Sequence, residues 1–176
     1  DHRNRLWGEH GRLFTEALPY FSGLLGRGAL APGHSADPAR GRAADPAAQA
    51  RLWKAAVNGD VAAARAALQA GADPNALDTS TTTSGRRALN YAAENDRAEM
   101  IRWLVANGAE VNLANHSGFT PLHHAAESGS TAAAEALLEL EADSKAKLPS
   151  GSTPLDLARQ RRKAEVARVL EKAPGS

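Results

Sequence analysis

The feature that most constrains the fold of this 176-residue chain is a repeat with a period of 33 residues. Leu89, Leu122 and Leu155 follow one another at this interval, and the pair Ala92-Ala93 recurs 33 positions later as Ala125-Ala126. A period of this length indicates an array of equal supersecondary units, each burying its apolar face against its neighbours. Only 5% of the residues are aromatic, so the core must be built from small aliphatic side chains, which suits closely packed helices.

The clearest copy of the repeat runs from Gly118 to Gly129 and reads GFTPLHHAAESG. Thr120 can cap a helix by accepting a hydrogen bond from a free backbone N–H, and Pro121 suits the first turn, where a missing N–H costs nothing. Leu122 then points into the core, and Gly129 separates this helix from the next. The fourth copy keeps the same order, GSTPLDLA, from residue 151 to residue 158.

A second helix is predicted in each repeat from an apolar stripe. In the second and third repeats its members are Met100, Ile101, Leu104, Val105, Ala133, Ala136, Leu137 and Leu138. Gly71 and Gly108 supply the left-handed residue that ends such a helix. An extended finger then leads to the next repeat.

These short motifs, at this spacing, resemble the ankyrin repeat over about residues 47–172. The resemblance implies an all-α solenoid of four helix–turn–helix repeats with β-hairpin-like fingers. We place the repeats at about residues 47–78, 79–115, 116–147 and 148–172.

Three positions depart from the family pattern. Arg87 stands where the family has the capping Thr, so the first helix of the second repeat should be more weakly capped. Asp96 and Glu141 each stand where the family has Gly, which makes these two turns less secure. Asp45-Pro46 offers an alternative start to the first repeat, and the polar run over 159–163 suits a solvent-facing terminal repeat.

Residues 1–30 match no word of the repeat but predict an amphipathic helical segment. Trp7, Phe14 and Phe21 fall on one helical face, which Pro19 interrupts. Residues 31–46 are rich in Ala, Pro and Gly and predict a linker or an irregular wrap. The apolar face has three possible uses: covering the first repeat, docking on a partner protein, or peripheral contact with a membrane. Docking would make the chain a structural subunit or assembly factor of a larger complex, which is our alternative function.

The finger between the first and second repeats has four extra residues, since Leu89 lies 14 residues after Asn75 while Leu122 lies 10 after Asn112. The finger contains the run TSTTTSGRR from residue 79 to residue 87. One interpretation is a solvated hairpin tip. The other is a contact loop or a phosphorylation site, where added charge could pair with the nearby arginines.

The resemblance also implies where a partner binds, because ankyrin proteins usually hold partners in a concave groove formed by finger tips and first-helix ends. The finger positions of this groove are Arg86, with Arg87 beside it, Phe119 and Ser152. The helix-end positions are Val57, Asn58, Glu94, Asn95, Glu127, Ser128, Gln160 and Arg161. Phe119 is either an aromatic anchor for the partner or packing between fingers. The glutamates favour a basic or polar partner segment.

Charge and residue content argue against other classes of function. The net charge of +1 gives no reason to expect nucleic-acid binding, although residues 88–143 carry nine Asp and Glu against two Arg, a balance of −7. The chain has no Cys, and we find no nucleophile motif, phosphate loop or metal-ligand spacing. The resemblance gives His123 a structural role. We therefore expect a non-enzymatic scaffold or adaptor that binds a protein or peptide, without cofactor or metal. No apolar run is long enough to span a bilayer, which favours a cytoplasmic or organelle-soluble protein.

Overall fold

The computed structural model describes residues 45–173, and that part of the chain forms four successive pairs of helices. The first helices of the pairs are α2 (Pro46–Asn58), α4 (Ala88–Glu94), α6 (Pro121–Ser128) and α8 (Pro154–Gln160). The second helices are α3 (Val61–Gln69), α5 (Ala98–Ala106), α7 (Thr131–Glu139) and α9 (Ala164–Glu171). The helical segment predicted over residues 1–30, with Trp7, Phe14 and Phe21, lies outside the described residues, as does nearly all of the linker.

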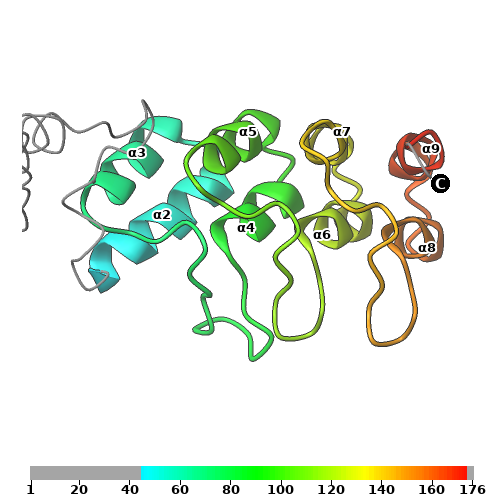
Figure 1. Ribbon diagram of the computed structural model, residues 1–176, viewed down its shortest axis with the longest axis horizontal. Helices are drawn as coiled ribbons and strands as arrows, with labels where there is room; N and C mark the ends of the chain where they lie inside the picture. Colours follow the sequence, from blue (N-terminus) through cyan, green and yellow to red (C-terminus); the bar gives the residue numbers. More distant parts are fainter. Residues whose placement is uncertain (1–44, 174–176) are drawn as a thin grey trace, which may run out of the picture. The chain divides into compact units, whose positions relative to one another are not determined.

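The pairs stack side by side in two rows (Figure 1). One row holds the first helices, the other holds the second helices, and the fingers project away from the first row. Each first helix packs against the next first helix along the array, as α4 does against both α2 and α6. The predicted all-α array of helix–turn–helix repeats is confirmed over these residues.

The first helices begin where the sequence motifs predict. Thr120 accepts a hydrogen bond from the His123 backbone N–H at 3.4 Å, with a proline in the first turn of α6. Thr153 does the same for Asp156 at 3.3 Å in α8. At α4 the side chain of Arg87 makes no capping hydrogen bond. The start of that helix keeps only the reciprocal contact, in which Asn90 Oδ1 accepts a hydrogen bond of 2.7 Å from the Arg87 backbone N–H. The prediction of a weaker cap at this helix is confirmed.

The turns keep a left-handed residue even where glycine has been replaced. After the first helices, Gly129 has φ 86°, and Asp96 and Arg162 have φ 56° and 57° at the corresponding turns. After the second helices, Gly108 has φ 98° and Glu141 has φ 63°. A side chain in this region costs roughly 1–2 kcal/mol of backbone strain. Asp96 offsets part of that cost, because its carboxylate accepts a hydrogen bond of 2.8 Å from the Ala133 N–H in the first turn of α7. The turns at Asp96 and Glu141, which the sequence predicts to be less secure, therefore keep their left-handed geometry.

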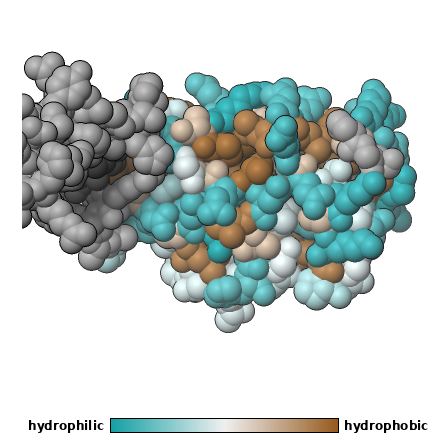
Figure 2. Space-filling model, viewed as in Figure 1, coloured by the Kyte–Doolittle hydropathy of each residue, from teal (hydrophilic) through white to brown (hydrophobic). Residues whose placement is uncertain are grey.

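The core runs between the two rows of helices and is built largely from alanine and leucine. Ala92, Ala93, Ala125 and Ala126 are completely buried, which allows neighbouring first helices to approach closely. Larger side chains such as Met100 and Leu137 fill the space between the rows. Figure 2 shows that apolar residues gather on the viewed face where the second helices lie, while the finger tips are mostly polar or of intermediate hydropathy.

Candidate functional site

The long finger between α3 and α4 is closed at its base by a short antiparallel bridge. Asp78 and Arg86 exchange backbone hydrogen bonds of 2.7 and 2.9 Å. The buried Asp78 carboxylate also accepts hydrogen bonds from the Tyr91 hydroxyl at 2.8 Å and from the Ser80 side chain at 2.5 Å. Burial acts to raise the pKa of Asp78, but the hydrogen bonds from Ser80 and Tyr91 outweigh it and lower the pKa below its ordinary value. The finger base is therefore an ordered hairpin.

The long finger leads into α4 and is called the second finger, and the fingers that lead into α6 and α8 are called the third and the fourth. The long finger is also tied to the third finger. Asn115 Nδ2 donates a hydrogen bond of 3.0 Å to the Gly85 carbonyl, and the His116 N–H donates one of 3.0 Å to the Ser84 carbonyl. The hydroxyls of Ser84 and Ser117 lie 2.6 Å apart. Because these contacts hold the residues after Thr82, the two fingers form one continuous wall beside the first helices.

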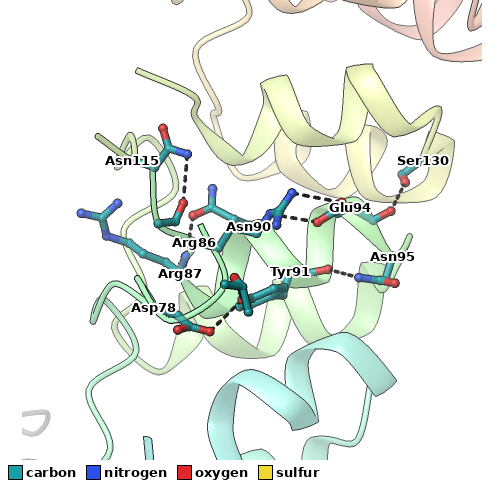
Figure 3. A network of polar contacts seen from close by, with 11 residues as sticks. Asp78, Arg86, Arg87, Asn90, Tyr91, Glu94, Asn95, Asn115 and Ser130 are labelled. Carbon is teal, nitrogen blue, oxygen red and sulfur yellow. Dashed lines mark hydrogen bonds and ion pairs between the residues drawn. The ribbon is translucent and has the colours of Figure 1, made fainter. Parts of the chain in front are cut away.

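Arg86 and Glu94, both predicted to face the groove, form an ion pair. Arg86 Nη2 donates to Glu94 Oε1 at 3.4 Å, while Nε lies 3.1 Å from Oε2 as an ion-pair contact without a hydrogen bond (Figure 3). The guanidinium also lies over the ring of Tyr91, 5.9 Å from its centroid. The pair links the finger to the end of α4.

Arg87 and Asn95 have structural partners instead. The Arg87 guanidinium donates to the carbonyls of Asn75 at 2.9 Å and Ala114 at 2.6 Å and so bridges two successive fingers. Asn95 Nδ2 donates to the Tyr91 carbonyl at 2.8 Å. Burial lowers the pKa of Arg87, although this guanidinium stays charged. A partner would find both side chains occupied.

Glu127 and Arg161 join the ends of α6 and α8. Arg161 Nη2 contacts Glu127 Oε1, and the two side chains are 58% and 33% exposed. An ion pair this open to solvent contributes little to stability. Ser128, Ser152 and Gln160 lie nearby along the same helix ends and finger, the two serines half-buried and Gln160 exposed.

A cleft of about 180 Å³ opens between the second and third fingers and the end of α6. Its lining residues are Thr82, Ser84, Gly85, Arg86, Asn115, Ser117, Phe119, His124 and Glu127. Three of the predicted groove residues, Arg86, Phe119 and Glu127, thus meet in one hollow. Phe119 packs its ring against His124, with centroids 5.4 Å apart, and is half-buried. Phe119 therefore packs between elements and lines the cleft, and its role as an anchor for a partner stays a prediction.

The two adjacent histidines differ in their surroundings. His123 Nδ1 lies 2.8 Å from Thr120 Oγ1 at the start of α6, and burial lowers the pKa of this ring more than the backbone at Ser152 and Ala146 raises it. His124 is 6% exposed, and its Nε2 has no hydrogen-bond partner among the described residues. Burial, with the charge of Arg86 beside it, lowers the pKa of His124 to about 4. His124 is therefore neutral near pH 7.

Within residues 45–173 no group of three or more His, Asp or Glu side chains is placed to hold a metal ion. None of the helices described there is long and apolar enough to cross a membrane.

Comparison with known proteins decides the family. The chain matches the family described as ankyrin repeats in three copies, over residues 52–147 and 116–175. The chain belongs to the ankyrin-repeat family. Ankyrin repeats are protein–protein interaction modules.

Individual ankyrin-repeat relatives differ greatly in length. Cyclin-dependent kinase 4 inhibitor B of Mus musculus is 35% identical over 127 residues, which cover 72% of this chain and 94% of that protein. The B-cell lymphoma 3 protein homolog of Mus musculus is 38% identical over 101 residues, 57% of this chain and 22% of that protein. The match to the tyrosine-protein kinase Shark of Drosophila melanogaster is 34% identical over 113 residues, 64% of this chain and 12% of that protein. This chain thus spans less than a quarter of the length of each of the last two relatives.

Sequence reasoning missed several residues of this ankyrin groove. The fingers are held in place by Asp78, Tyr91 and Asn115, and none of these residues belongs to the repeat motifs named above. A signal was present for Asn115, because its Oδ1 accepts from the N–H groups of Ser117 and Phe119, a local turn that Asn favours. No local signal marks Asp78 as the partner of Tyr91, since 13 residues separate them.

Proposed function

We propose that this chain is a non-enzymatic scaffold or adaptor that holds a segment of a partner protein in its concave groove. The groove is the surface formed by the tips of the second to fourth fingers and by the ends of the first helices. The observation that carries the proposal is the cleft between the second and third fingers, where the fingers are fastened to each other and half-buried Phe119 lines the hollow. A preorganised surface of this kind loses little conformational entropy when a partner binds.

Two further features support a groove that receives protein. The fingers are fastened by buried contacts of Asp78 and Asn115, so their tips present a defined shape. Residues 88–143 carry a charge balance of −7, which favours association with a basic partner segment. The relative named cyclin-dependent kinase 4 inhibitor B is by its name an inhibitor of another protein, and 94% of its length matches this chain. Such a relative supports a repeat array that works by binding.

The experiment is affinity purification with the full 176-residue chain as bait, followed by quantitative mass spectrometry. The groove variant is Ser128→Arg, because Ser128 lies at the end of α6 and its replacement adds bulk to the groove. The matched control is Glu135→Arg, which introduces the same side chain at an exposed position of α7, on the second-helix row. We expect Ser128→Arg to lose partners that Glu135→Arg retains.

Other outcomes would contradict the proposal. If both variants retain every partner, or if Glu135→Arg alone loses them, the partner lies elsewhere on the molecule. Circular dichroism of both variants, with unchanged unfolding midpoints, ensures that a lost partner reflects the surface and not the fold.

A further inference from the structure

The cleft between the second and third fingers contains a polar atom that the fold itself does not use. His124 is more than nine-tenths buried, lines the cleft, and has no hydrogen-bond partner at Nε2 within the described residues. The accessible surface of Nε2 is below 1 Å², so a ligand in the cleft meets the ring of His124 and its neighbours and not this atom.

The surroundings of His124 have a definite chemistry. The ring of Phe119 lies against the imidazole and offers an aromatic surface to the cleft. Glu127 lines the same cleft, and only its Oε1 is engaged, by Arg161; its Oε2 has no ion-pair or hydrogen-bond partner in residues 45–173. An aromatic face beside a carboxylate oxygen suits a planar cation, which stacks on the ring and donates to the oxygen.

The cation already in the cleft is paired. Arg86 lines the cleft; its Nη2 donates to Glu94 Oε1 and its Nε lies 3.1 Å from Oε2 without a hydrogen bond, so the Glu94 carboxylate offsets part of its charge. Arg161, the other cation near Glu127, is 58% exposed, and its ion pair is weak enough to be shared or displaced. An anion would instead meet the free oxygen of Glu127.

We propose that this cleft is the subsite for one arginine side chain of the partner, which stacks on Phe119 and donates hydrogen bonds to Glu127. The inference rests on the proposed function and adds the chemistry of one contact. The volume of about 180 Å³ suits a single long side chain and not a folded element. A neutral imidazole adds no positive charge beside the guanidinium, and burial keeps His124 in that state.

The test is a ¹H–¹⁵N NMR titration of the full chain with N-acetyl-arginine methylamide as the probe. The neutral isostere N-acetyl-citrulline methylamide has nearly the same shape without the charge. We expect the arginine probe to shift the amide signals of Gly85, Phe119 and His124 and the citrulline probe to bind about fivefold more weakly, since the charge-assisted contact is lost. A lysine probe should bind between the two, because its ammonium cannot form a planar fork.

Variants locate the contact. Glu127→Gln removes the carboxylate and keeps its shape, so we expect it to weaken the arginine probe about fivefold and leave the citrulline probe unchanged. The matched control Glu135→Gln removes the same charge from exposed α7 and should leave both titrations unchanged. Equal binding of arginine and citrulline, shifts confined to other residues, or no binding of the arginine probe would each overturn the subsite.

These results separate the subsite from the groove. If the arginine probe fails while Ser128→Arg still abolishes partner capture, the groove stands and only the arginine subsite is wrong. If Ser128→Arg leaves partner capture intact, the groove itself is wrong and the subsite is rejected with it.

Discussion

The Tyr91 hydroxyl donates a hydrogen bond of 2.8 Å to the Asp78 carboxylate, and this contact fastens the base of the long finger to helix α4. The donor comes from a first helix and the acceptor from the finger before it, so the contact determines where the finger leaves the repeat stack. Thr81 also contacts the same hydroxyl, at 3.3 Å and in a more exposed place.

Removing the Tyr91 hydroxyl should loosen the finger. Tyr91→Phe leaves the Asp78 carboxylate without one of its donors, so we expect the free energy of unfolding to fall by about 1–2 kcal/mol in urea denaturation. Amide exchange at residues 78–86 should become faster. The control Thr81→Val removes only the weaker contact and should cost under about 0.5 kcal/mol. Equal effects of the two variants would show that the buried hydrogen bond is unimportant.

Removing the Asn115 amide should separate two fingers. Asn115 is 9% exposed and its side chain bonds the Gly85 carbonyl and the N–H groups of Ser117 and Phe119. We expect Asn115→Ala to lower the free energy of unfolding by about 2–3 kcal/mol, since several backbone groups lose their partner. The loss should appear in thermal unfolding. Asn107→Ala, at an exposed helix end, is the control and should cost less than half as much; a reversed order would contradict the assignment.

Glycine at one replaced turn should stabilise the chain. Glu141 is exposed, has φ 63°, and makes no side-chain hydrogen bond among residues 45–173, so Glu141→Gly should relieve strain and raise the free energy of unfolding by about 1 kcal/mol. Asp96→Gly is the matched comparison, because it relieves similar strain but removes the carboxylate that accepts from the Ala133 N–H. We expect it to be neutral or destabilising. Equal gains in urea denaturation would mean that the Asp96 hydrogen bond contributes nothing.

His124 should make stability depend on pH. Its pKa is about 4 in the folded chain and 6.5 when unperturbed, so the unfolded chain binds more protons between these values. The contribution of the neutral ring is therefore fully present above about pH 6.5 and is lost as the pH falls toward about 4. A difference of this size corresponds to roughly 3 kcal/mol of unfolding free energy.

The check is urea denaturation from pH 7 to pH 4 on the unmodified chain and on His124→Leu. The fourth repeat already has Leu157 at the corresponding position, buried in α8, so the replacement suits the fold. We expect the variant to lose less stability on acidification. His116→Gln, at an exposed position of the third finger, is the control and should keep the behaviour of the unmodified chain. An unchanged slope in His124→Leu would rule out this ring as the source.

The two arginines of the long finger show where sequence reasoning stops. Arg86 and Arg87 are neighbours, and both were predicted to face the partner. In the structure Arg86 pairs with Glu94, whereas Arg87 bonds carbonyls that lie 12 and 27 residues away in sequence. The choice depends on acceptors brought near by the stacking of fingers, which no local pattern encodes.

The sequence by itself determined the helices, their starts and the turns between them, because each depends on residues close together in the chain. Thr120 with Pro121 starts α6, and a left-handed Gly129 ends it. Only the tertiary structure decided how Glu127 pairs with Arg161, 34 residues on, and how Phe119 and His124 meet the long finger around one cleft. Those relationships arise from packing between repeats, where side-chain direction and charge are set by neighbours that the local sequence does not contain.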